Sequence, residues 1–364
     1  MDISVINHFR DVVNSRGFTY FWYRTRSELN HWNCICSAMD WITVSVEHIN
    51  SVTPEKAKSM SSIDVFAYIS SVDIIVESVQ QLYRVIFKTR ELLFKDDSDI
   101  FVGNQFGQND IRYFKTLRSC FGAHPVNLEE PGAEQKREMR RFASWSSNTW
   151  GNGTSSVILY SNQHKEEDIF LSIDLQQILR FGEKFYTHLK VLGQVLNEQY
   201  EMFAAERRAE VIPFSEDPNE HLDILLNTSE QRLDNPVYRS NIQELQLLFS
   251  TTVTDADNEA LVAAYHNNLR LLISEIHEHL QNMDFTDLDY DYLLYPSLKS
   301  MPNGAGYWYE KISEYIFGGG YPPILWETQI RDLIKPYAKL NYSSYEELYL
   351  LVQAVLYSIG ANTN

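Results

Sequence analysis

The residues of this sequence that are best suited to chemistry lie in the segment 117–127, which contains Arg118 and His124 with five residues between them. An arginine side chain is permanently cationic and can hold a phosphate group through its planar fork of N–H donors. A histidine side chain can accept or release a proton near neutral pH. Together, the two side chains could bind a phosphate and transfer a proton beside it.

The spacing of these two residues requires a break in the helix that carries them. In a continuous helix, residues six positions apart point about 120° away from each other, so Arg118 and His124 would not share a face. Gly122 is a poor helix former, and the residue before Pro125 avoids the helical region. We therefore expect the helix to end near Gly122, which lets His124 approach Arg118 or a partner subunit.

The segment Arg118-Ser119-Cys120-Phe121-Gly122-Ala123-His124 resembles the signature of the HEPN superfamily, the higher-eukaryote and prokaryote nucleotide-binding domains. That signature is an Arg, four to six residues and a His, near the last helices of a compact helical bundle. The resemblance covers about residues 25–130. Many members are metal-independent endoribonucleases, often with a composite site at a dimer interface. Ser119 stands where active members commonly carry Asn.

The resemblance implies a metal-independent endoribonuclease of stress or phage defence, with RNA as a partner and a homodimer formed through the N-terminal bundle. His124 would be the general acid or base, and Arg118 would bind the phosphate. Lys115 and Arg112, one and two turns before the motif, and Ser119 within it, would bind the substrate.

No metal and no cofactor are expected from the sequence. The spacing Asp287-x-Asp289-x-Asp291 is similar to the start of a calcium-binding loop. However, Tyr292 stands where that loop needs glycine, and Leu298 stands where it needs the closing Glu. The chain offers no other credible set of ligands.

Three alternatives to catalysis stay open. In the first, Arg118 pairs with a nearby acid and His124 caps the helix end. In the second, the protein is a non-catalytic all-helical interaction module whose acidic, Tyr-rich C-terminal region binds a protein partner. In the third, the acidic region masks the basic patch of the N-terminal part. The tyrosines concerned are Tyr290, Tyr292, Tyr295, Tyr307, Tyr309 and Tyr315.

Composition and charge limit the function classes. The 364 residues carry a net charge of −18, which argues against a general nucleic-acid-binding surface. Residues 210–364 hold 8 Lys and Arg against 23 Asp and Glu, whereas residues 1–130 hold 13 against 16 and could present a local basic patch. No apolar run approaches the length of a membrane span, and the first residues do not resemble a signal peptide. The three cysteines favour a reducing cytoplasm over a disulfide scaffold.

The hydrophobic pattern predicts a mainly α fold with a small antiparallel β-meander. We expect a HEPN-like helical bundle over residues 1–130, the meander and a long helix packed on it over 131–209, and an acidic helical region over 210–364. Residues 211–218 are predicted to be a linker. Expected helices are 1–16, 28–51, 62 to about 94, 110–122, 175–208, 241–250, 256–283, 306–317, 325–339 and 344–359. Expected strands are 141–145, 156–160 and 169–173.

Overall fold

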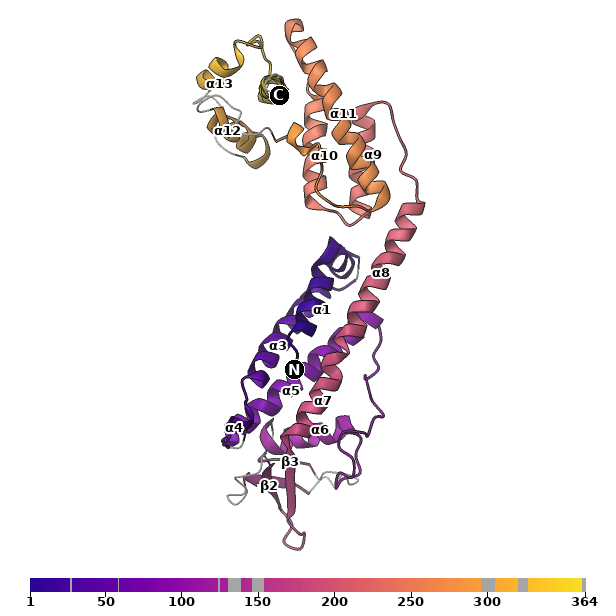
Figure 1. Ribbon diagram of the computed structural model, residues 1–364, viewed down its shortest axis with the longest axis vertical. Coiled ribbons are helices and arrows are strands. Elements are labelled where there is room, and N and C mark those ends of the chain that lie inside the picture. Colours follow the sequence, from indigo (N-terminus) through magenta and orange to yellow (C-terminus); the bar gives the residue numbers. More distant parts are fainter. Residues whose placement is uncertain are drawn as a thin grey trace. The chain divides into compact units, whose positions relative to one another are not determined.

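The computed structural model describes residues 1–26, 28–57, 59–123, 125–129, 139–145, 154–295, 305–319 and 327–361. The chain forms two compact units, Met1–Tyr200 and Glu201–Asn364, and each is described by itself. Most described residues are helical, and one small antiparallel sheet accompanies them (Figure 1), which confirms the predicted fold class. The expected β-meander lies within the first unit.

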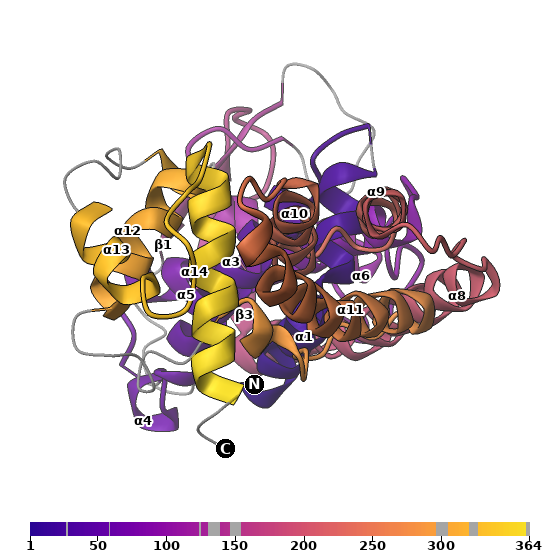
Figure 2. The ribbon, with the colours of Figure 1, turned by 90° about the horizontal axis from the view of Figure 1, so that it is seen from above.

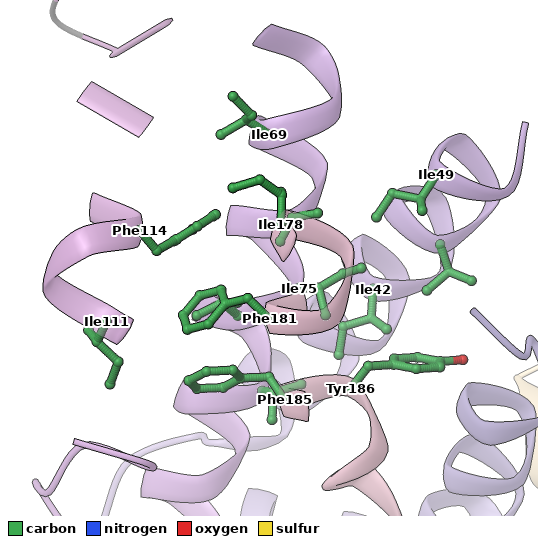
Figure 3. Packing of buried hydrophobic residues seen from close by; sticks show 14 of the residues in the cluster. Ile42, Ile49, Ile69, Ile75, Ile111, Phe114, Ile178, Phe181, Phe185 and Tyr186 are labelled. Carbon is green, nitrogen blue, oxygen red and sulfur yellow. The ribbon is translucent and has the colours of Figure 1, made fainter. Parts of the chain in front are cut away.

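The first unit is built on a helical bundle. Its helices are α1 (Ser4–Asn14), α2 (Phe18–Tyr20), α3 (Trp32–Asn50), α4 (Pro54–Ala57), α5 (Ser62–Phe87), α6 (Asp110–Arg118) and α7 (Leu175–Thr187), and the N-terminal part of α8 (Leu189–Ala209) continues it. Figure 3 shows aliphatic side chains of α3 and α5 meeting the aromatic side chains of α6 and α7. Burial of these apolar surfaces is the main stabilising term for such a bundle.

Helix α5 begins as the sequence predicts but ends earlier. Ser61 caps it, because its Oγ accepts from the Asp64 N–H while Asp64 accepts from the Ser61 N–H in return. The predicted end near Phe94 is wrong, because Lys88 adopts a left-handed conformation with φ 51° and stops the helix. In its first turns Val65 and Ile69 face the core, whereas Ile63 is 72% exposed.

The sheet contains β1 (Arg141–Trp145), β2 (Thr154–Ser161) and β3 (Ile169–Asp174) in the order β1-β2-β3, all antiparallel, as predicted. Val157 pairs with both Trp145 and Leu171. One face of the sheet is buried through Val157, Leu159, Leu171 and Ile173, so the meander packs on the bundle.

The predicted long helix after the sheet is divided in two. Asp174 caps α7 by accepting a hydrogen bond from the Gln176 N–H at 2.8 Å. Helix α7 ends at Thr187, and α8 begins at Leu189. His188 keeps φ −66° and ψ −16°, so the interruption is one residue long.

The second unit is helical throughout its described part. Its helices are α9 (Pro218–Gln231), α10 (Pro236–Ser250), α11 (Glu259–Asn282), α12 (Ala305–Gly318), α13 (Glu327–Ile334) and α14 (Tyr345–Ala361). Helix α14 lies between the α12–α13 pair and the α10–α11 pair (Figure 2). The sequence prediction missed α9, although Asp217 followed by Pro218 is a favourable start for a helix.

Candidate functional site

The helix that carries the motif is fixed firmly at its start. The Asn109 side chain caps α6 by accepting from the Arg112 N–H at 2.9 Å. The next residue, Asp110, is buried and accepts hydrogen bonds from the backbone N–H groups of Asp99, Ile100 and Phe101 at 3.0–3.1 Å. These bonds tie the preceding loop to α6, so the helix has a defined position against the bundle core.

The motif itself falls on a change of helix type. Helix α6 ends at Arg118, and a π-helical turn continues over Ser119–Ala123. Such turns are rare and are frequently found at functional sites. Helical structure therefore stops within one residue of Gly122, in agreement with the prediction. A Cβ atom on Gly122 would overlap the Phe66 ring, so any larger residue at this position requires that ring to move.

Arg118 forms an ion pair with Asp73 of α5. Its Nη1 lies 3.2 Å from Oδ1 and 3.1 Å from Oδ2 of that carboxylate. Burial raises the pKa of Asp73 and the positive charge of Arg118 opposes this rise. The first alternative to catalysis predicted such an acidic partner for Arg118. The Arg118 side chain nevertheless keeps 36% of its surface exposed, so Asp73 orients it without enclosing it.

The other predicted cations of α6 lie near this pair. Arg112 and Lys115 are exposed, and Ser119 is half-buried. Lys115 lines a cavity with Asp73 and Glu77, but its volume of about 20 Å³ leaves room for little more than one water molecule. This cavity is therefore no substrate pocket, and a ligand of these cations would have to bind on the open surface.

His124 lies outside the described residues, and its neighbours on both sides are described. Before it, the buried Phe121 ring contacts the Trp145 ring of β1 at 5.4 Å between centroids. After it, the Pro125 carbonyl accepts a hydrogen bond from the Ala143 N–H at 2.7 Å, and Leu128 exchanges two backbone hydrogen bonds with Arg141. The sheet thus anchors the chain on the C-terminal side of the motif.

The sequence reasoning missed Asp73, the residue that orients Arg118. The available signal was a lone carboxylate within the apolar run of α5, between Val72 and Ile74. A charge at such a position usually has a partner. Cys120, within the motif, is a poor nucleophile. Burial raises the pKa of its thiol to about 12.

Within the described ranges, no group of three or more His, Cys, Asp or Glu side chains could hold a metal ion, and Cys34, Cys36 and Cys120 are free thiols. Among the described helices, none has the length and apolar character needed to cross a bilayer. Comparison with protein-family models, with curated proteins and with solved structures found no match.

Proposed function

We propose that the first unit is a metal-independent endoribonuclease of HEPN type that acts in the cytoplasm in stress or phage defence. The observation that carries the proposal is the setting of Arg118. Asp73 fixes this guanidinium at the end of α6 while about a third of its surface stays exposed. Arg112 and Lys115 are exposed on the same helix and could contact neighbouring phosphates.

The proposed reaction needs only groups of the chain and the RNA. His124 removes the proton of a ribose 2′-OH, and the resulting oxygen attacks the adjacent phosphorus. The bond from phosphorus to the 5′ oxygen breaks, and that oxygen takes up a proton. Arg118 binds the phosphate while its negative charge increases, and the Ser119 hydroxyl can donate to the same group. The products are a 2′,3′-cyclic phosphate and a 5′-hydroxyl.

A homodimer would complete this site. The reaction requires a base and an acid at once, and each chain supplies one Arg118–His124 motif. Helix α3 presents Trp41 and Val44 to solvent one turn apart, with 55% and 53% of their surfaces exposed. Large exposed side chains such as Trp are enriched at protein interfaces. We propose that two copies associate through this face of the bundle.

The test is cleavage of mixed single-stranded RNA by the purified full chain in the presence of a chelator. His124→Ala and Arg118→Ala should each lower the rate by about 100-fold or more. Arg118→Lys should restore little, because a point charge does not replace a planar fork. The control is Arg180→Ala, which removes an exposed arginine of α7. Products without a cyclic phosphate, or a fully active Arg118→Ala, would refute the proposal.

The association is tested separately by light scattering at micromolar concentrations. Wild type should be a dimer, and Trp41→Glu should be a monomer with an unchanged circular dichroism spectrum. A monomeric wild type that cleaves RNA would exclude the composite site while leaving catalysis in place.

The alternative function is partner binding by the second unit. This unit carries a net charge of −15, from 10 Lys and Arg against 25 Asp and Glu. Tyr309 is buried, but Tyr292, Tyr295 and Tyr307 expose about half of their surfaces, as expected of an interface for a basic protein. The test is titration of the full chain with an arginine-rich peptide. Loss of binding in Tyr292→Ser and Tyr307→Ser, in a chain that cleaves no RNA, would favour this function.

A further inference from the structure

The first unit contains a cleft that the Arg118 motif does not use. It has a volume of about 690 Å³, which is within the range of sites that hold small organic ligands. Residues of three neighbouring segments line it: the turn before α3, the C-terminal part of α5, and the residues that directly follow α5. The lining includes Trp22, Arg26, Glu28, Arg84, Lys88 and Arg90.

The charge of this cleft differs from that of the unit around it. The first unit has a net charge of −3, from 21 Lys and Arg against 24 Asp and Glu. The cleft walls carry four permanent cations and one carboxylate, that of Glu28. In the part of the chain that the structure describes, none of the four cations forms an ion pair. A cleft lined by one sign of charge concentrates ions of the opposite sign.

Arg84 brings a buried hydrogen-bond donor to this cleft. Its Nε is buried, and no described residue accepts a hydrogen bond from it. Leaving a buried donor without an acceptor is unfavourable, more so for a charged group. Lys88 lies with Nζ 5.7 Å from the centre of the Trp22 ring, and Arg26 stacks on Phe21 at 5.1 Å. An aromatic ring attracts a cation through its face and leaves the N–H groups free to donate to a ligand.

We propose that this cleft binds a small compound that carries two or more phosphate groups. Because the cleft has four cations and one carboxylate, a ligand with several negative charges matches it best. A guanidinium group binds a phosphate through two parallel hydrogen bonds. The Trp22 and Leu29 side chains provide an apolar wall for an organic part of the ligand. Asp73 and Arg84 are separated by about 16 Å along α5, from eleven residues at a rise of about 1.5 Å each. The cleft is therefore distinct from the Arg118 motif, and its assignment does not depend on ribonuclease activity.

The experiment is calorimetric titration of the full chain with two probes, inorganic tripolyphosphate and adenosine triphosphate, without metal. Both should bind, and binding should weaken as salt is added. Arg84→Gln and Arg90→Gln should each weaken binding by about tenfold or more, because each removes charge-assisted hydrogen bonds. Arg180→Gln, outside the cleft, should bind as wild type does. Tighter binding of the nucleotide would show that the apolar wall contributes, and equal binding would show recognition through phosphate alone.

Arg90 is exposed, so its variant tests the cleft without disturbing the core, and thermal unfolding checks that Arg84→Gln is folded. The proposal is overturned if neither probe binds at millimolar concentration, or if both variants bind as wild type does. It is also overturned if a short RNA binds through Arg84 and Arg90 while neither small probe does, since the cleft would then be a surface for a nucleic-acid strand.

Discussion

Asp73 in the first unit and Glu244 in the second are both carboxylates whose pKa is raised by burial, but their partners differ. Asp73 faces the guanidinium of Arg118, which is partly exposed to solvent. Glu244 is 5% exposed and accepts hydrogen bonds from neutral donors, Tyr349 Oη at 2.6 Å and Gln353 Nε2 at 3.4 Å.

Glu244 belongs to a buried network of hydrogen bonds. Gln353 Nε2 also donates to the Tyr309 hydroxyl and to the Leu294 carbonyl, both at 3.0 Å. The Tyr309 hydroxyl donates to the same carbonyl at 3.0 Å. Every one of these side chains is buried. The network therefore links α10, α12 and α14 within the second unit, and its side chains lie in the core rather than at the surface.

Asp73 and Glu244 differ in whether the partner of the carboxylate reaches solvent. In the first unit, the carboxylate fixes a cation that still reaches solvent, so that cation can bind a ligand. In the second unit, the buried carboxylate accepts hydrogen bonds from neutral groups inside the core, so its consequence is stability and the dependence of that stability on pH. The net charge also differs between the units, which carry −3 and −15.

The largest expected effect concerns the pH dependence of the second unit. Burial raises the pKa of Glu244 from 4.5 to about 7. The folded state therefore binds this proton more tightly than the unfolded state, so the contribution of Glu244 to stability is fully present below pH 4.5 and is lost as pH rises through about 7. The total change is about 3 kcal/mol.

Denaturant unfolding at pH 5 and pH 8 should show this loss in wild type, and Glu244→Gln should remove it. The exposed Glu346→Gln is the control, and an unchanged dependence in Glu244→Gln would contradict the prediction.

A smaller effect is expected at the π-helical turn of the first unit. Gly122→Ala places a methyl group against Phe66, which should destabilise this unit by about 1–3 kcal/mol. Phe66→Leu combined with Gly122→Ala should recover part of the loss, because the smaller side chain makes room. A double-mutant cycle by thermal unfolding measures the coupling. Additive effects would mean that the two residues are not in contact.

The smallest effect on stability is expected for Asp73→Asn. Arg118 is partly exposed, so breaking the pair should cost about 1 kcal/mol or less. The catalytic proposal predicts a larger loss of RNA cleavage than of stability, because Arg118 would lose its orientation. Comparison of the cleavage rate with the unfolding midpoint separates the two roles. A variant that loses several kcal/mol would show that Asp73 is mainly structural, as Glu244 is.

Much of the helical fold was predictable from local patterns. Ser61 with Asp64, Asn109 and Asp174 are capping residues that fix helix starts through bonds to near neighbours in the chain. Helix ends were less predictable. Nothing local required α5 to stop at Phe87, and α9 lacks the clear apolar periodicity that identifies a helix. The HEPN resemblance, the role of His124 and the RNA substrate stay predictions.

The sequence by itself determined the mainly α class, the three-stranded meander and the position of Arg118 at a helix end, because these depend on residues close together in the chain. Only the tertiary structure decided that Arg118 pairs with Asp73, 45 residues away, and that Arg26 joins Arg84 in one cleft. It also decided that Glu244 is enclosed by Tyr349 and Gln353. The physical reason is that the partner of a charge is set by how helices pack, and hydrophobic periodicity identifies the buried face of a helix without identifying what lies against it.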